Sequence, residues 1–393
     1  MASGMPRLAR TVVVLGLASL LTDLSSDMIY PLLPAFLAIT LGAGAVGLGA
    51  MEGAAETTAA LLKVGSGKLA DRFRVRKPLV VLGYSISGLV RPLIGLAQSW
   101  PVVVALRLGD RVGKGVRTAP RDALIADQTP PELRGRAYGL HRAMDNAGAV
   151  LGPLVAAGLL GLGLSTRQVF LAAAVPGVLV VAVLALGVRE SRRELETTQA
   201  KRDVASDELG APFRNVLLAV AVFTLGNSSD MFLLFYLGHA GLDAGAVALV
   251  WAGHNVVRTL AVLAGGPIAD RFDKRRLLLL GWFLYALTYA ALWWASSATA
   301  IAALIVLYGL HYGLVEPTER ALVAELAPST RRGAAFGWFH GVIGLAALPA
   351  SALAGVVWWK VAPRATFALG AGLALVAFLL LAVLVPRRTP QPS

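Results

Sequence analysis

The chain has 393 residues, no cysteine and a formal net charge of +13. Hydrophobic residues make up 56% of it and charged residues only 15%, whereas ordinary soluble domains contain about 25% charged residues. The absence of cysteine excludes a disulfide framework, a thiolate metal site and a cysteine nucleophile. Apolar segments of about 20 residues recur along nearly the whole length, and each is long enough to cross a bilayer. These properties predict an all-α integral membrane protein.

The apolar segments predict twelve transmembrane helices. The first segment is too long for the apolar core of a signal peptide and lacks a convincing cleavage site, so we expect it to be retained. Paired tryptophans near helix ends, at 293–294 and 358–359, are predicted to anchor the membrane interface. In chain order the predicted helices cover residues 11–39, 44–70, 78–98, 101–126, 136–163, 167–189, 213–239, 243–269, 277–297, 299–327, 333–359 and 364–386.

The basic residues indicate how these helices are oriented. Most Lys and Arg residues outside the helices lie in the even-numbered connections and at the two ends of the chain. The odd-numbered connections contain only Arg167, Lys360 and Arg364. Cationic loops stay on the cytoplasmic side, so both termini are predicted to be cytoplasmic. The positive net charge therefore reports topology, and no nucleic-acid partner is expected.

A duplicated pattern divides the chain into two halves. The pattern Gly-x-x-Ala-Asp-Arg-Phe begins at Gly67 and again at Gly266, and a basic cluster follows each copy. Ser25-Ser26-Asp27-Met28 is likewise repeated as Ser228-Ser229-Asp230-Met231. We interpret the chain as two pseudo-symmetric six-helix bundles, with a substrate site near the bilayer midplane between them. The predicted boundaries are 1–188 for the first bundle, 189–213 for a charged cytoplasmic linker and 214–393 for the second bundle.

Several charged residues fall inside the predicted helices of the first half. Burying a charge in hydrocarbon is costly, so each such residue needs a partner, water or a function. A helix rises about 1.5 Å per residue, which places the acids and bases of helices 1, 2 and 4 at similar depths. We expect them to form an ion-pair network, which is compatible with a proton and substrate relay. The candidate proton-coupling residues are Asp27, Glu52, Glu56, Arg107, Arg111, His141 and Asp145.

A proton carrier needs a carboxyl group whose basic partner approaches in only one conformation. Asp27 and Glu56 are the predicted carriers, with Arg107 or Arg111 as the movable partner. Asp23 is a weaker candidate. His141 could assist because imidazole ordinarily titrates near neutral pH, although a hydrogen-bonded structural histidine is the alternative.

Most aromatic residues lie in the second half, where they could line an amphipathic substrate cavity. Ordinary packing or lipid contact is the alternative for most of them. Polar residues could add specific contacts to substrate, and Lys114 on helix 4 continues the basic face of the first half. The candidate cavity residues are Tyr30, Lys114, Asp230, Phe232, Tyr236, His254, Asn255, Tyr312, Glu316 and Phe339.

Three patterns resemble those of the major facilitator superfamily, the twelve-helix secondary transporters. The segment from Gly67 to Lys77 resembles the loop 2–3 signature, with Arg74 at a usual glycine. The segment from Arg107 to Gly115 resembles the helix 4 signature, with Asp110 and Arg111 where Gln and Gly are usual. Gly148, Gly152 and Pro153 resemble the helix 5 pattern of proton-linked exporters, although Ala156 and Ala157 replace its last two glycines.

The resemblance implies a gate as well as a fold. The first signature, formed by Gly67, Asp71, Arg72 and Arg76, would latch the cytoplasmic side in the outward-open state. Asp270 and Arg271 would be its copy in the second half. The alternative is that these loops only anchor the chain by their positive charge.

The resemblance also implies proton-coupled efflux of a small organic compound by alternating access. The alternative is proton-coupled uptake of a metabolite or organic anion, which the basic helix 4 would suit. An intramembrane enzyme or receptor is the least favoured interpretation, because no catalytic constellation appears. The expected partners are a small-molecule substrate and the lipid bilayer, with a monomeric chain in the plasma (inner) membrane. No cofactor or metal beyond the proton gradient is expected.

Overall fold

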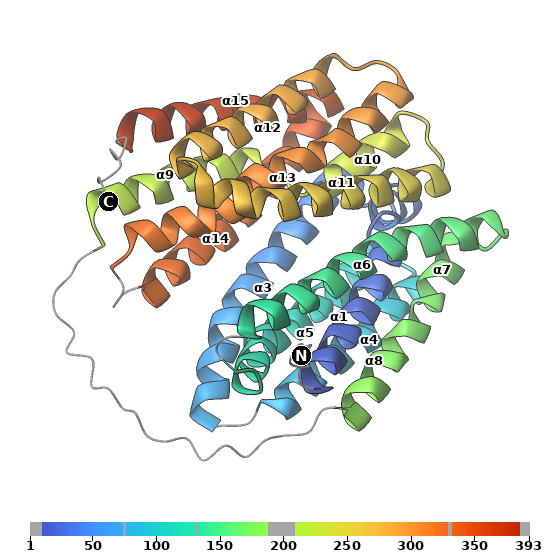
Figure 1. Ribbon diagram of the computed structural model, residues 1–393. Coiled ribbons are helices and arrows are strands. Elements are labelled where there is room, and N and C mark those ends of the chain that lie inside the picture. The colour runs from blue at the N-terminus through green and yellow to red at the C-terminus, as the bar shows by residue number, and fades with distance from the viewer. Residues whose placement is uncertain (1–9, 74–75, 131–132, 188–208, 329–331, 386–393) are drawn as a thin grey trace, which may run out of the picture. The chain divides into compact units, whose positions relative to one another are not determined.

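A computed structural model describes residues 10–73, 76–130, 133–187, 209–328 and 332–385 (Figure 1). These residues form helices joined by short turns, and no strand occurs among them. The predicted all-α class is therefore confirmed. Side chains of residues 63–73 lie outside the description, and so does most of the predicted linker at 189–213.

The helices follow the twelve predicted segments closely. Among the described residues, ten segments are long and apolar enough to span a membrane. The other two predicted spans are the helices α3 and α5, which are 30 and 28 residues long and carry most of the charges discussed above. The elements are α1 (Arg10–Ile29), α2 (Leu33–Ala35), η1 (Phe36–Thr40), α3 (Gly44–Phe73), α4 (Lys77–Leu93), η2 (Ile94–Leu96), α5 (Trp100–Asp127), α6 (Arg134–Gly161), α7 (Thr166–Ala172), α8 (Ala174–Gly187), α9 (Ala211–Gly226), α10 (Met231–His239), α11 (Ala244–Arg271), α12 (Lys274–Trp294), α13 (Ala298–Leu326), α14 (Arg332–Lys360) and α15 (Pro363–Leu384).

Three predicted helices are interrupted, which corrects their assignment as continuous. The first breaks after Ile29, where Pro31 and Pro34 lack the backbone N–H that a helix interior requires. The sixth divides at Ala173 into α7 and α8, and the hydroxyl of Ser25 donates to the carbonyl of Ala173 at 3.0 Å. A side chain thus satisfies a backbone group at the break.

The seventh predicted helix is interrupted between α9 and α10. Asn227 ends α9 with a non-helical ψ of 73°. The hydroxyl of Tyr285 donates to the carbonyl of Gly226 at 3.0 Å, so this backbone acceptor keeps a partner where the helix stops. The repeated Ser-Ser-Asp-Met tetrapeptide therefore lies inside α1 in its first copy but spans the break in its second.

The turns preserve the internal repeat at another place. Gly42 precedes α3 with a φ of 73°, and Gly241 precedes α11 with a φ of 94°. Both values lie in the left-handed region, which glycine adopts without steric cost. Because the two glycines are 199 residues apart, like the two loop signatures, the turns occupy equivalent places in the two halves.

The described helices form two compact units. The first contains the described parts of Met1–Gly42, Thr58–Glu196 and Asp243–Ala252. The second contains those of Ala43–Thr57, Thr197–Leu242 and Gly253–Ser393. Helices α3 and α11 are each divided between the units.

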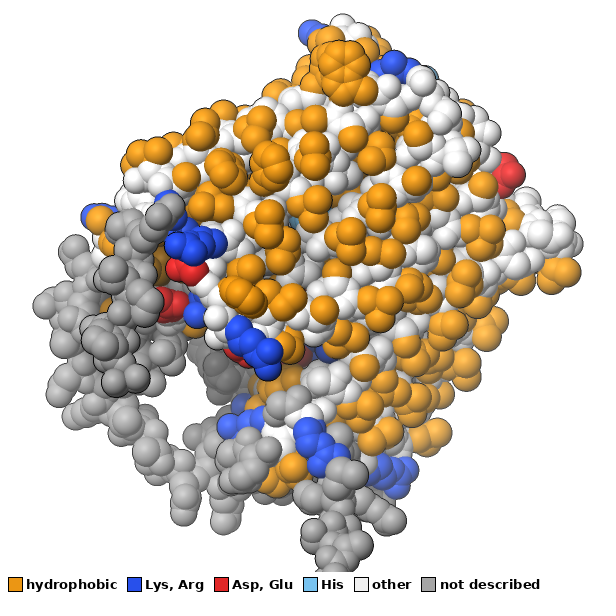
Figure 2. Space-filling view, turned by 45° about the horizontal axis from the view of Figure 1, so that its top comes forward, with side chains coloured by type: hydrophobic (Ala, Val, Ile, Leu, Met, Phe, Trp, Pro, Cys, Tyr) orange, Lys and Arg blue, Asp and Glu red, His pale blue; other side chains and the backbone are white. Residues whose placement is uncertain are grey.

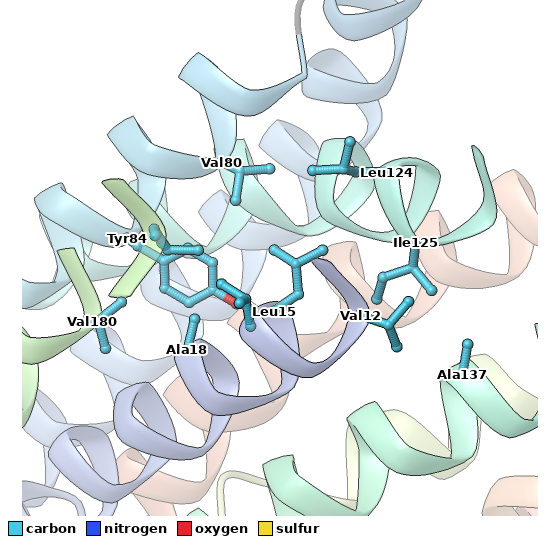
Figure 3. Close-up of a cluster of buried hydrophobic side chains, with 11 residues drawn as sticks. Val12, Leu15, Ala18, Val80, Tyr84, Leu124, Ile125, Ala137 and Val180 are labelled. Atoms are coloured by element: carbon cyan, nitrogen blue, oxygen red, sulfur yellow. The ribbon is translucent and has the colours of Figure 1, made fainter. Parts of the chain in front are cut away.

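Each unit has its own core. In the first, side chains from α1, α4, α5, α6 and α8 form one buried cluster, which includes Tyr84 with 1% exposure (Figure 3). In the second, Trp282 stacks on Phe223 with ring centroids 4.8 Å apart, and Tyr285 stacks on Tyr289 at 4.1 Å. Figure 2 shows a face of the described helices on which hydrophobic side chains outnumber charged ones, as expected for a surface in contact with lipid.

One of the predicted interfacial anchors is a core residue instead. Trp358 is 8% exposed and stacks on Phe235 with ring centroids 4.8 Å apart. Trp359 next to it is 70% exposed and Trp294 is 80% exposed, so these two remain available to the interface. Adjacent helical residues point in directions about 100° apart, since a turn contains 3.6 residues, and the two members of the pair cannot share one environment.

Two glycines bring α6 against α1 (Figure 1). A Cβ added at Gly152 would lie 2.8 Å from both the Cβ of Asp27 and the carbonyl oxygen of Leu24. One added at Gly148 would meet the carbonyl oxygen of Leu20. The small residues therefore allow the backbones to approach closely, as in other small-xxx-small contacts between membrane helices.

The substitution Gly152→Ala is expected to destabilise the protein by about 1–3 kcal/mol, because the new methyl group overpacks the contact with α1. Thermal unfolding of the purified protein measures this. Gly158→Ala on the same helix is the matched control, since a Cβ at this exposed position meets nothing within 4 Å. The control should be neutral or slightly stabilising because alanine favours helix. Equal stability of the two variants would contradict the contact.

Candidate transport site

A buried ion-pair cluster joins α4 to α5 in the first unit. The Nε of Arg91 donates to the carboxylate of Asp110 at 2.8 Å, and Arg107 lies 3.5 Å from the other oxygen of the same carboxylate. Arg91 also donates to the carbonyl oxygen of Thr22 on α1 at 2.7 Å. One carboxylate thus balances two guanidinium groups, and Arg91 ties three helices together.

Basic groups exceed acids along the buried side of α5. Arg107, Arg111 and Arg117 are 3%, 6% and 5% exposed, and Asp110 is 1% exposed. Arg117 donates to the hydroxyl of Ser87 at 2.7 Å and lies over the ring of Tyr84, with 4.5 Å from Cζ to the centroid. The aromatic face stabilises this cation in a place with little water.

Asp27 lies half-buried on α1, next to the close contact with Gly152. The indole Nε1 of Trp251 donates to its Oδ1 at 3.4 Å. The charges of Arg91, Lys114 and Asp145 also act on this carboxyl group. Lys114 itself is exposed on α5. Asp27 is therefore a carboxyl group with basic neighbours and one aromatic N–H donor.

Tyr30 links this region to the ion-pair cluster. Its ring lies 5.5 Å from that of Trp251, and Arg107 lies over the same ring at 5.5 Å. Both the carboxylate at Asp110 and the aromatic ring at Tyr30 therefore hold Arg107. Arg107 pairs with Asp110 in this conformation, and the role of Arg107 or Arg111 as a movable partner of Asp27 and Glu56 stays a prediction.

Asp145 and His141 lie one turn apart on α6. Ser19 donates to Asp145 at 2.6 Å and Arg142 at 3.1 Å. His141 is 5% exposed, and its Nε2 has no hydrogen-bond partner among the described residues. Asp145 is thus tied to α1 through Ser19.

The second unit holds its own polar group around Asp230, which is half-buried at the start of α10. Tyr308 donates to its Oδ1 at 3.3 Å, and Tyr312 donates to its Oδ2 at 3.1 Å. The hydroxyl of Tyr308 also lies 3.4 Å from the Oδ1 of Asn227. Two phenols of α13 therefore hold the carboxylate at the break in the seventh predicted helix.

Arg258 on α11 adjoins this group. Its guanidinium lies 4.0 Å from the centroid of the Tyr312 ring and forms an ion pair with Glu316. Arg320 lies 3.9 Å from the other oxygen of Glu316. Tyr308, Tyr312 and Glu316 follow one another at four-residue steps and so occupy one face of α13.

The two acids of α3 also lie in the second unit. Glu52 is 2% exposed, and the hydroxyl of Ser229 lies 3.4 Å from its Oε2. Glu56 is half-buried one turn further along. Their predicted relation to the bases of α5 stays a prediction.

Most of the aromatic cavity candidates are packed inside the second unit. His254 is fully buried, its Nδ1 bonds the carbonyl of Ile305 at 2.9 Å, and its ring stacks on Tyr308. Asn255 is 6% exposed. The other buried candidates, each at most 3% exposed, are Phe232, Tyr236 and Phe339. These side chains pack against neighbouring side chains in this conformation. Ordinary packing was the alternative that the sequence left open for the aromatic candidates.

The structure describes the side chains of some predicted gating residues but not of others. Those of Gly67, Asp71 and Arg72 lie outside the described residues. Arg76 donates to the carbonyl of Ala123 at 3.2 Å and forms an ion pair with Asp127, both at the end of α5. In the second unit Asp270 and Arg271 are exposed at the end of α11, and Lys274 bonds Glu325 at 3.1 Å. The latch itself stays a prediction.

Sequence reasoning missed Arg91 as a site residue and noted Asp110 only as a departure from a signature. The available signal was a base in the otherwise apolar stretch before Pro92 and a single acid among the bases of residues 107–114. A buried charge in a membrane requires a partner, so the lone Arg91 of α4 could have been paired with the unexpected Asp110 of α5.

Twelve helical segments, an internal repeat and paired charges inside the helices define a multi-pass membrane protein of the secondary transporter class. The family model described as Major Facilitator Superfamily matches residues 15–257 and 216–393. The chain therefore belongs to this superfamily and is a transporter of its type.

Two relatives and one solved structure illustrate the relationship. An uncharacterized MFS-type transporter of Methanocaldococcus jannaschii is 34% identical over 381 residues, covering 95% of this chain and 94% of the relative. The multidrug resistance protein MdtH of Photorhabdus laumondii is 28% identical, covering 81% and 80%. The crystal structure of a D-xylose-proton symporter is similar with a TM-score of 0.79 at 17% identity, covering 96% and 98%. At this identity the likeness shows the fold alone.

Proposed function

We propose that the protein exports a small organic compound in exchange for protons, as a monomer in the plasma (inner) membrane. The observation that carries the proposal is Asp27, a half-buried carboxyl group with Lys114 and Arg91 within electrostatic reach and an indole donor beside it. A carboxyl group that can lose or regain a basic partner as the protein changes conformation can bind a proton on one side and release it on the other. No residue has a catalytic role in this proposal.

Two further observations support export. Gly148 and Gly152 pack α6 tightly against the helix that carries Asp27, in the pattern that resembles proton-linked exporters. The relative in Photorhabdus laumondii is named a multidrug resistance protein.

The test is proton movement in proteoliposomes loaded with a pH-sensitive dye. Norfloxacin, a zwitterionic aromatic drug, is a suitable first probe because the site contains both buried bases and carboxylates. When norfloxacin is added on one side without a pH gradient, antiport predicts that its entry drives protons out of the vesicle lumen and raises the internal pH. Acidification of the lumen together with entry would instead show symport. Liposomes without protein correct for passive diffusion.

The surplus of buried bases on α5 favours a second candidate, proton-coupled uptake of an organic anion. Arg107, Arg111 and Arg117 are all buried on α5, and such a concentration of positive charge attracts an anionic cargo. The same vesicle assay with benzoate as the probe distinguishes this candidate. Uptake driven by an inward proton gradient, and absent without one, would favour it over export.

A further inference from the structure

The two aspartates of the repeated Ser-Ser-Asp-Met tetrapeptide have closely similar surroundings. Each is half-buried. Asp27 receives a hydrogen bond from an aromatic N–H donor, and Asp230 receives hydrogen bonds from two phenols. Each also has a base within electrostatic reach on another helix of its own unit, namely Lys114 for Asp27 and Arg258 for Asp230.

We propose that Asp230 is a second proton-binding carboxyl group, so that each half of the transporter carries one. This inference deepens the proposed antiport by doubling its proton sites, and it rests on that function only for the direction of proton flow. The proton bonds to a carboxylate oxygen of Asp230 and leaves from it again, and no covalent bond of the chain changes.

Arg258 is the group that can make this binding depend on conformation. In the described structure it forms an ion pair with Glu316 and lies over the ring of Tyr312, which in turn donates to Asp230. A shift of Arg258 toward Asp230 would favour the ionised carboxylate and release a proton, whereas its retention by Glu316 favours protonation. The four-residue step of α13 places Glu316 on the same helical face as Tyr312, which donates to Asp230.

The other charged and titratable groups around Asp230 are compatible with this role. They come from α3, α11, α12 and α13, and they are Glu52, Arg258, Tyr285, Tyr289, Tyr308 and Tyr312. Among the described residues, Arg258 is the base whose charge acts most strongly on Asp230. Proton release at Asp230 is therefore sensitive to the position of this side chain.

Infrared difference spectroscopy of the protein in lipid tests the proposal without a substrate. As the pH is lowered, the C=O stretching band of protonated carboxylic acids grows. We expect Asp230→Asn to remove one component of this band and Asp27→Asn to remove another. Asp230→Glu should restore a component at a changed frequency. Asp273→Asn is the matched control, because Asp273 is an exposed N-cap of α12 and asparagine also caps helices well.

An unchanged protonated-carboxyl band in Asp230→Asn would overturn the proposal. So would a band at Asp230 that appears only after sodium is removed, since that would identify a metal-cation site. If Asp230→Asn fails to fold, the band of protonated carboxyl groups in Asp27→Asn decides. A component that remains in this variant and responds to Arg258→Gln supports a second site. The absence of such a component overturns the proposal. Failure of norfloxacin to move protons would contradict the antiport but leave the spectrum intact, so the two failures are distinguishable.

Discussion

Asp27→Asn is expected to lower the number of protons moved per substrate by about half or more, because one carrier carboxyl group can no longer bind a proton. Downhill movement of the substrate should continue, since asparagine keeps the shape of the side chain and can still accept from Trp251. The measurement is the ratio of proton to norfloxacin flux in proteoliposomes. With Asp230 as the second carrier, the double variant Asp27→Asn/Asp230→Asn should carry substrate without protons.

Two comparisons make this result specific to Asp27. The control Asp273→Asn removes a carboxyl group from an exposed turn and should keep the wild-type ratio. Glu56→Gln tests the other predicted carrier on α3. If Asp27→Asn and Glu56→Gln both retain the wild-type ratio, neither residue couples protons, and the assignment is wrong.

The second large effect is on stability. Asp110→Asn is expected to lower the free energy of unfolding by about 3–5 kcal/mol, the range for breaking one partner of a buried ion pair. The reason is that Arg91 and Arg107, which are 4% and 3% exposed, would lose the carboxylate between them. Thermal or denaturant unfolding in detergent measures the loss.

The neighbouring pair Arg121–Asp122 supplies the matched control. Its N–O distance is also 2.8 Å, but the side chain of Asp122 is 43% exposed. Exposed ion pairs contribute about 0–1 kcal/mol, so Asp122→Asn should have a small effect. Similar losses for Asp110→Asn and Asp122→Asn would show that burial does not set the strength of these pairs, and the role given to Asp110 would fail.

Much of the fold could be predicted from the sequence, because bilayer thickness fixes the length of a spanning helix. The twelve apolar segments became the observed helices within a few residues at most ends. The repeat was also visible, since Gly67 and Gly266 begin the same motif and the glycines of two equivalent turns follow the same spacing. The family resemblance carried by these motifs was confirmed by the match over the chain.

Pro31 and Pro34 were a visible signal for the interruption after Ile29, but the interruption before Asp230 could not be placed from the sequence. The same four residues, Ser-Ser-Asp-Met, continue a helix at Asp27 and leave it at Asp230. What differs is tertiary: the carbonyl of Gly226 accepts from Tyr285, a residue 59 positions away. Local helix propensity carries no information about this distant hydrogen-bond donor, so the sequence predicted a continuous helix.

The partners of the buried charges were decided in the same way. Residue spacing alone showed that Arg107 and Arg111 share a region of one helix. It did not show that Arg91 would pair with Asp110, because the relative rotation of α4 and α5 depends on how their small residues pack. A Cβ at Gly113, for example, would lie 2.6 Å from the carbonyl oxygen of Gly83. Thus the sequence alone determined the membrane class, the apolar segments and the duplication, since hydrophobic length and repetition are properties of the chain itself. Which charges face one another was decided only by the tertiary structure, because the cost of an unpaired charge in a membrane is relieved by contacts between helices far apart in sequence.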